Sequence, residues 1–144
     1  MTQKFVHLIS SQNLSDSNEY KTVFAFALQQ AKHHNSDVTL VINNISRNTC
    51  FLEHVFDSKQ IKLLSNGEEI RLGNTVVRLK SLKTLKDYES YDVLCAFHAA
   101  PETILKMEKS VNPSSIIVLG ENIEQHLNDW VNENNVQSLS HWAN

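Results

Sequence analysis

The side chain best suited to chemistry in this sequence is His98, which directly follows the apolar run Asp92–Phe97 (DVLCAF). A continuous apolar run of this length is typical of a buried strand, so His98 is expected to leave a strand and enter the short loop before Pro101. Imidazole is well suited to proton transfer near neutral pH. The sequence therefore predicts His98 as a general acid or base. The alternative is a half-buried histidine that donates to a nearby backbone carbonyl.

Polar side chains also follow the other predicted strands. In open α/β sheets, ligands bind beyond the carboxyl ends of the strands. Helix N-termini that follow the strands would point N–H donors toward the same region. The predicted ligand-binding residues are Ser10, Ser11, Asn13, Asn43, Asn44, Glu121 and Asn122. The alternative is that these side chains only end strands and cap helices.

No strong catalytic or metal-binding motif accompanies these residues. The sequence holds neither GxGxxG nor GxxxxGK[ST], and three Gly leave little backbone that could wrap a pyrophosphate. Cys95 falls inside the predicted strand, where a buried thiol is usually inert. If the chemistry needs a nucleophile, Ser10 or Ser11 would have to supply it. Cys50 and His54 stand four residues apart on a predicted helix, where core packing is favoured over a metal site. We predict no metal site, and no motif in the sequence indicates which cofactor, if any, the chain binds.

The elements that position these residues alternate between strands and helices. Apolar runs predict buried strands at Lys4–Ser10, Val38–Ile42, Asp92–Phe97 and Ile116–Leu119, and a short edge strand at Val136–Leu139. A capping box of Asp16 and Glu19 opens the first helix, whose apolar residues recur at 3.6-residue spacing from Tyr20 to Ala31. Further helices are expected at Arg47–Phe56, from Pro101 to Lys109, and from Ile123 to Asn132.

The middle of the chain breaks this alternation. Three short runs, Ile61–Leu64, Glu69–Leu72 and Thr75–Leu79, are separated by turn signals at Asn66-Gly67 and Gly73-Asn74. We therefore predict a three-layer α/β/α open sheet, mainly parallel and Rossmann-like, with a short antiparallel meander around residues 60–80. The 144 residues suit one domain spanning 1–144, and a hydrophobic share of 41% with 20% charged residues is ordinary for a globular protein.

Charge is unevenly distributed along the chain. Residues 59–86 carry a local balance of +5, whereas residues 87–144 carry −7 within a net charge of −3. Arg71, Arg78 and Lys80 are expected on the exposed side of the meander as an interaction patch for an acidic protein partner or a second copy of the chain. The alternative is that these charges only keep a solvent-exposed sheet edge from pairing with the strands of other molecules. The negative net charge and the lack of interleaved aromatic residues argue against nucleic acid.

The sequence also bears on location and function. It contains no apolar stretch long enough for a membrane span. Its two cysteines lie far apart and belong to no CxxC or His/Cys ligand spacing, and although a secreted chain of this size could join them, the fold does not need the disulfide, so we expect a reduced, cytoplasmic protein. Two hypotheses of function follow. The first is a non-catalytic module that binds a ligand or a protein and self-associates. The alternative is a small enzyme or carrier for a phosphorylated or nucleotide-like metabolite, with His98 as acid or base at the carboxyl edge of the sheet.

Overall fold

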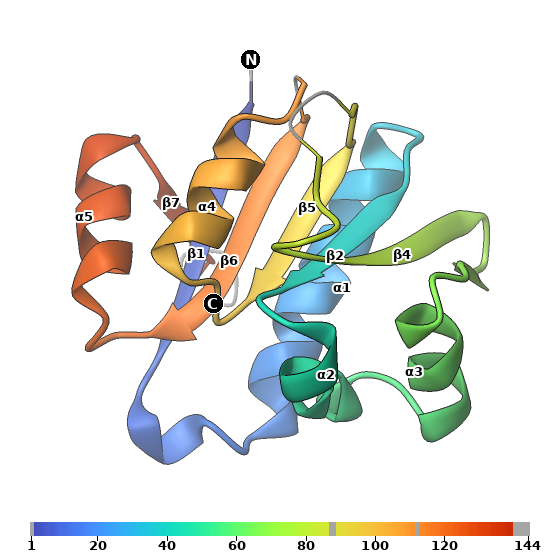
Figure 1. Ribbon diagram of the computed structural model, residues 1–144. Coiled ribbons are helices and arrows are strands. Elements are labelled where there is room, and N and C mark those ends of the chain that lie inside the picture. Colours follow the sequence, from blue (N-terminus) through green and yellow to red (C-terminus); the bar gives the residue numbers. More distant parts are fainter. Residues whose placement is uncertain (1, 87–88, 112, 140–144) are drawn as a thin grey trace.

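The computed structural model describes residues 2–86, 89–111 and 113–139, and in this part of the chain seven strands form one sheet (Figure 1). Their order across the sheet is β3-β4-β2-β5-β6-β1-β7. The strands are β1 (Gln3–Ile9), β2 (Val38–Ile42), β3 (Ile70–Leu72), β4 (Thr75–Ser81), β5 (Val93–Phe97), β6 (Ser115–Glu121) and β7 (Gln137–Ser138). The pair β3 and β4 is antiparallel and the other neighbouring strands run parallel, which confirms the predicted mainly parallel sheet.

Helices cover both faces of the sheet. The helical elements are α1 (Ser17–His33), α2 (Ile45–Asn48), α3 (Ser58–Ser65), α4 (Pro101–Glu108), α5 (Gln125–Glu133) and the 3-10 turns η1 (Ser11–Asn13) and η2 (Thr49–His54). Figure 1 shows α4 and α5 in front of the sheet and α1 behind it. One apolar core lies between the sheet and α1, η2 and α3, and a second lies between the sheet and α4 and α5. The three-layer α/β/α architecture is as predicted, and the finer Rossmann-like description stays a prediction.

The central strands are buried because both of their faces meet a helix layer. Each of the five residues of β2 and of β5 is buried, which explains why their sequences are continuously apolar rather than alternating. In β6 only the last residue is partly exposed. Gly120 lies beneath α5, where a Cβ atom would collide with the side chain of Leu127, so this glycine permits close packing of the helix on the sheet.

The strand order determines which loops meet at the functional edge. β5 lies between β2 and β6, and β1 lies on the far side of β6. Since these strands are parallel, they deliver the residues after Ile42, Phe97, Glu121 and Ile9 to one edge of the sheet, the lower edge in Figure 1. His98 is therefore flanked by the loops that follow β2 and β6.

The predicted meander is wrong in its first strand. Ile61–Leu64 belongs to α3, whose first turn is closed by a reciprocal capping box: Asp57 Oδ1 accepts from the Gln60 N–H at 2.8 Å, and Gln60 Oε1 accepts from the Asp57 N–H at 3.0 Å. Asn66-Gly67 then ends this helix instead of turning a hairpin. The hairpin at Gly73-Asn74 is confirmed, with Gly73 in the left-handed region at φ 65°. Its second strand, β4, pairs with β2 and so belongs to the main sheet.

Other elements shift at their ends. The predicted helix Arg47–Phe56 is split into α2 and the 3-10 turn η2. The last predicted helix begins at Gln125, and Ile123 is 72% exposed instead of facing inward. Asp16 caps α1 as predicted, but Glu19 pairs with His7 of β1, so the capping box is not formed. Within the described residues, no helix combines the length and hydrophobicity needed to cross a bilayer.

Candidate functional site

His98 occupies a strained turn directly after β5. Its φ of 55° lies in the left-handed region, which residues other than glycine seldom adopt. Neighbouring elements hold this conformation: the His98 N–H donates to the Leu119 carbonyl of β6 at 2.7 Å, and His126 Nε2 of α5 donates to the Ala99 carbonyl at 2.9 Å. Backbone strain of this kind persists only where the surroundings impose it, and it clusters at functional sites.

Asn43 completes the support of this turn from β2. Its Nδ2 donates to the His98 carbonyl at 2.8 Å. Its Oδ1 accepts from the Ala100 N–H and from the Thr103 hydroxyl, both at 2.8 Å, at the start of α4. All of these hydrogen bonds join Asn43 to other residues of the protein, namely His98, Ala100 and Thr103. Asn43, predicted as a ligand-binding residue, is therefore a positioning residue for His98.

Tyr20 determines the tautomer of the His98 ring. Tyr20 is fully buried, and its hydroxyl donates to the Leu14 carbonyl at 2.9 Å while lying 2.8 Å from His98 Nε2. A phenol has one proton to donate, and the carbonyl can only accept. His98 Nε2 must therefore carry a proton and donate it to the Tyr20 oxygen. Burial raises the pKa of Tyr20 to about 12, with smaller contributions from Cys50 and Glu121, so this hydroxyl stays protonated at neutral pH.

The other ring nitrogen of His98, Nδ1, has no hydrogen-bond partner among the described residues. In that part of the chain the one fully buried side-chain nitrogen or oxygen without a partner is Ser65 Oγ, so His98 Nδ1 must reach the surface. Burial lowers the pKa of His98 and His54 lowers it further, while Glu124 and Glu121 oppose the shift. The ring is therefore neutral at pH 7. Its Nδ1 presents a free lone pair that can accept a hydrogen bond or a proton.

Aromatic rings from η2 pack beside this imidazole. The His54 ring stacks on Tyr20 with centroids 4.1 Å apart and an interplanar angle of 9°, and its Nδ1 lies 2.9 Å from the Ser17 hydroxyl. The Phe51 ring lies 4.4 Å from that of His98, tilted by 41°. We refer to Tyr20, Phe51, His54 and His98 as the His98 cluster. Apart from Tyr20, its members are half-buried, so they combine apolar ring faces with access to solvent.

Carboxylates lie on the β6 side of the His98 cluster. Glu121 ends β6 and accepts from the Ser11 hydroxyl at 3.3 Å, and the Glu121 N–H donates to Glu124 Oε1 at 3.0 Å. The charged groups that act on the pKa of His98 are these two glutamates and His54. The electrostatic surroundings are therefore acidic, which favours an uncharged or cationic ligand over a phosphate.

The remaining predicted site residues serve local structure. Asn44 caps α2, and its side chain accepts from two backbone N–H groups of that helix. Ser10 precedes η1 without capping it, and its carbonyl accepts from the N–H of the exposed Asn13. The N–H of Asn122 donates to the Ile9 carbonyl at 2.9 Å. Of the residues predicted at this edge, Ser11, Asn43 and Glu121 join the surroundings of His98.

The sequence does not predict three members of the His98 cluster, Tyr20, Phe51 and His54, as site residues. Tyr20 is predicted on the inward face of α1. A buried tyrosine hydroxyl needs a hydrogen-bond partner, and this need is the feature of the sequence that could have indicated a polar contact for Tyr20. Cys50 and His54 are predicted to pack in the core, and this is wrong for Cys50, which is exposed because η2 is a 3-10 turn instead of an α-helix. Phe51 lies on the same turn, and no pattern in the sequence relates it to His98.

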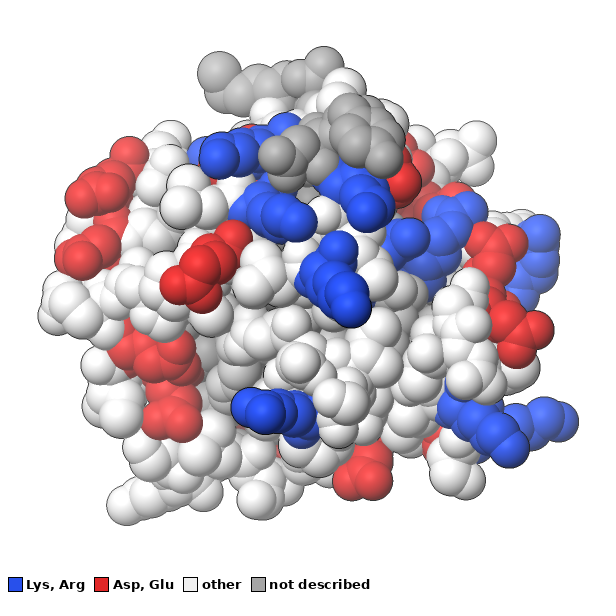
Figure 2. Space-filling view, in the orientation of Figure 1, with Lys and Arg blue, Asp and Glu red and all other residues white. Residues whose placement is uncertain are grey.

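The basic residues predicted as an interaction patch share one face of the sheet. Arg71 pairs with Val76 across the β3–β4 hairpin, so its side chain lies on the same face as those of Arg78 and Lys80. Arg78 is paired with Glu69 at 2.8 Å and with Asp37 at 3.3 Å. Arg71 and Lys80 make no hydrogen bond or ion pair within the described residues. Figure 2 shows several Lys and Arg side chains gathered on the face seen there.

Fold and site together define an α/β protein with a pre-organised imidazole at the carboxyl edge of a parallel sheet. Comparisons of the chain with protein-family models, with curated proteins and with solved structures find no match. Within the described residues, no group of three or more His, Cys, Asp or Glu side chains is arranged to hold a metal ion. The geometry of the site is therefore the evidence for the function of this chain.

Proposed function

We propose that this chain is a non-catalytic ligand-binding α/β module that holds its ligand at the carboxyl edge of the sheet, against His98. The observation that carries the proposal is the state of the imidazole. One nitrogen is bound to Tyr20, and the other presents a free lone pair to solvent. A side chain held in one orientation and one tautomer loses little conformational entropy when it binds, so pre-organisation of this kind favours affinity.

The surroundings indicate the chemistry of the ligand. The Nδ1 atom can accept from an N–H or O–H group, and the exposed parts of Phe51 and His54 can contact a flat ring. Glu121 and Glu124 stabilise positive charge near His98. A small ring compound with an N–H donor, uncharged or cationic, fits these features best.

The alternative function is an enzyme or carrier for a phosphorylated or nucleotide-like metabolite, in which His98 Nδ1 takes a proton from the substrate. The neutral ring can accept a proton, as a general base must. Two features weigh against it. A phosphate group would lie near Glu121 and Glu124, and one of the two predicted nucleophiles, Ser11, donates its hydroxyl proton to Glu121. The binding module therefore remains the favoured function.

An NMR titration tests the proposal and separates it from the alternative. Protein with labelled histidines is titrated with purine and pyrimidine bases, aromatic amines, nucleoside monophosphates and inorganic phosphate. The binding module predicts that the first two groups shift the His98 imidazole signals, and that His98→Asn abolishes binding because Asn tolerates the left-handed backbone but cannot present Nδ1. The matched control is His34→Asn, at the exposed end of α1, which should bind normally.

The two functions give different outcomes in this titration. A response to nucleoside monophosphates alone, with turnover of a phosphorylated compound, would replace the binding module with the enzyme. If no compound moves the His98 signals, the proposed site is wrong. The remaining function would then be protein binding through the face that carries Arg71, Arg78 and Lys80, toward an acidic partner or a second copy of the chain.

The proposed location is the cytoplasm. Both cysteines are free, Cys50 on the surface and Cys95 in the core, so the fold makes no use of an oxidising compartment. Expression of a tagged chain followed by fractionation tests this assignment, and recovery in a secreted fraction would contradict it.

A further inference from the structure

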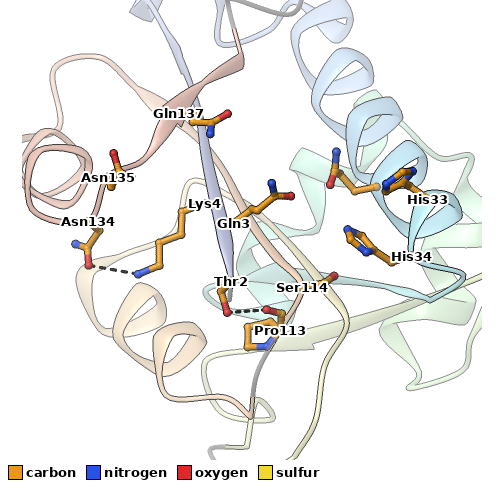
Figure 3. Close-up of a pocket in the computed structure, with 11 residues that line it drawn as sticks. Thr2, Gln3, Lys4, His33, His34, Pro113, Ser114, Asn134, Asn135 and Gln137 are labelled. Atoms are coloured by element: carbon orange, nitrogen blue, oxygen red, sulfur yellow. Dashed lines mark hydrogen bonds between the residues drawn. The ribbon is translucent and has the colours of Figure 1, made fainter.

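A second polar site lies at the opposite, amino-terminal edge of the sheet. A hollow of about 1070 Å³ opens where β1 and β6 begin and where α1 and α5 end. Figure 3 shows the lining side chains around it, with His33 at the end of α1 and the next residue, His34, on one side and Asn134 and Asn135 beyond α5 on the other. Its volume lies just above the range of roughly 300–1,000 Å³ that is typical of pockets for small ligands.

The lining is unusually rich in carboxamides. Five of the eleven lining residues are Asn or Gln: Gln3, Gln30, Asn134, Asn135 and Gln137. The carboxamides of Gln3, Asn135 and Gln137 are exposed and make no hydrogen bond to any described residue. Gln30 accepts from the Ser115 hydroxyl at 3.3 Å through Oε1, which leaves its NH₂ group free. The hollow thus offers several donor–acceptor pairs that the fold itself does not use.

Formal charge contributes little to this lining. Among the described residues, the lining holds no Asp or Glu, and the one lysine there, Lys4, is paired with Glu108 of α4 at 2.8 Å. The carboxyl ends of α1 and α5 both face this edge, and the negative partial charge of a helix end disfavours an anion. A phosphate or carboxylate ligand is therefore poorly matched here. An uncharged ligand with many hydroxyl groups is well matched, because a carboxamide can donate to one hydroxyl and accept from its neighbour.

We propose that this amide-rich hollow binds an uncharged oligosaccharide. The exposed rings of His33 and His34, which meet edge to face at an interplanar angle of 82°, supply faces against which the C–H surfaces of a sugar can lie. The Gln3, Asn135 and Gln137 amides bind its hydroxyl groups. This site is separate from the His98 cluster, which lies at the other edge of the sheet, so either proposal can fail alone.

Saturation-transfer NMR with the whole chain tests this site. The probes are neutral di- and trisaccharides of glucose, galactose, mannose and N-acetylglucosamine, with glucose 6-phosphate, glucuronic acid and an uncharged tripeptide for comparison. At least one neutral sugar should receive saturation from the protein and the three comparison compounds should not. Binding should weaken about tenfold in the variant Gln3→Ala/Gln137→Ala, which loses two sets of hydrogen bonds.

The matched control is Gln29→Ala, which removes one exposed carboxamide from α1 outside the hollow and should leave sugar binding unchanged. His98→Asn should also leave it unchanged, which separates this site from the one at the carboxyl edge. The proposal is overturned if no neutral sugar binds, if a charged sugar or the tripeptide binds in preference, or if Gln29→Ala weakens binding as much as the double variant.

Discussion

His98 Nε2 lies 2.8 Å from the hydroxyl oxygen of Tyr20, although 78 residues separate them in the sequence. The Tyr20 proton is used on the Leu14 carbonyl, so the imidazole must be the donor in this pair. This one contact determines which nitrogen faces solvent. It links the first helix of the chain to the loop after β5, and it is the reason why the edge of the sheet presents a basic nitrogen instead of an N–H group.

The first prediction concerns pH. Burial lowers the pKa of His98 below its usual value of about 6.5, so between the two values the unfolded chain binds this proton and the folded protein does not. The contribution of His98 to stability is therefore complete above about pH 6.5 and is lost as the pH falls toward the folded-state pKa. Urea unfolding at pH 7.5 and pH 5 should show the wild type losing more stability than His98→Asn. An equal loss in both proteins would contradict the lowered pKa.

The second prediction concerns Tyr20→Phe. This change removes the acceptor of the His98 Nε2 proton and the donor to the Leu14 carbonyl, and leaving buried polar groups unpaired costs about 1–3 kcal/mol. NMR should also show the His98 ring losing its single tautomer. A double-mutant cycle with His98→Asn measures the contact itself, and we expect a coupling of about 0.5–3 kcal/mol. Additive effects within a few tenths of a kcal/mol would show that the two side chains do not interact.

The third prediction tests the core on the α4 and α5 side of the sheet. Leu94 of β5 is fully buried there, so Leu94→Ala should lower the free energy of unfolding by about 2–5 kcal/mol, through lost burial and the cavity left behind. Leu105→Ala is the matched control, because Leu105 is 57% exposed on α4 and should cost far less. Similar denaturation midpoints for the two variants would remove Leu94 from the core.

The fourth prediction concerns the thiols. Burial raises the pKa of Cys95 to about 12, so it has almost no thiolate at pH 8, whereas Cys50 is exposed. A thiol reagent should label native protein at Cys50 alone and should reach Cys95 only after denaturation. Cys50→Ser should then abolish labelling of the native protein. Rapid native labelling of that variant would show that Cys95 is accessible.

The fifth prediction concerns self-association. If the face with Arg71 and Lys80 meets the acidic segment 87–144 of a second copy, raising the salt concentration from about 0.05 to 0.5 M should shift the protein toward monomer, because salt screens the attraction between the charges. Arg71→Ala/Lys80→Ala should produce the same shift at low salt. Light scattering follows both. A monomer at every salt and concentration would rule out self-association, and a salt-insensitive dimer would indicate an apolar interface.

The sequence by itself determined the features that depend on neighbouring residues. The buried strands β2, β5 and β6 are readable because both of their faces are covered, which leaves continuous apolar runs. Asp16 before α1 and Pro101 at the start of α4 mark helix beginnings through local backbone chemistry. The sequence also predicts His98 as a site residue, because this histidine directly follows such a strand.

The local pattern of apolar residues did not predict the secondary structure correctly where a segment was short. The four-residue run Ile61–Leu64 is as compatible with one face of a helix as with a strand, and the capping box of Asp57 and Gln60 decides for α3. The same limit applies to η2, where a change from α to 3-10 geometry turned Cys50 outward and placed Phe51 beside His98.

Only the tertiary structure decided how the candidate site is built. The strand order sets β5 between β2 and β6, and so makes Asn43 the support of the His98 turn and Glu121 its charged neighbour. The crossing of α1 over the sheet brings Tyr20 to His98. These contacts join residues far apart in the chain, and their energies depend on pairing and burial that no local window of sequence contains.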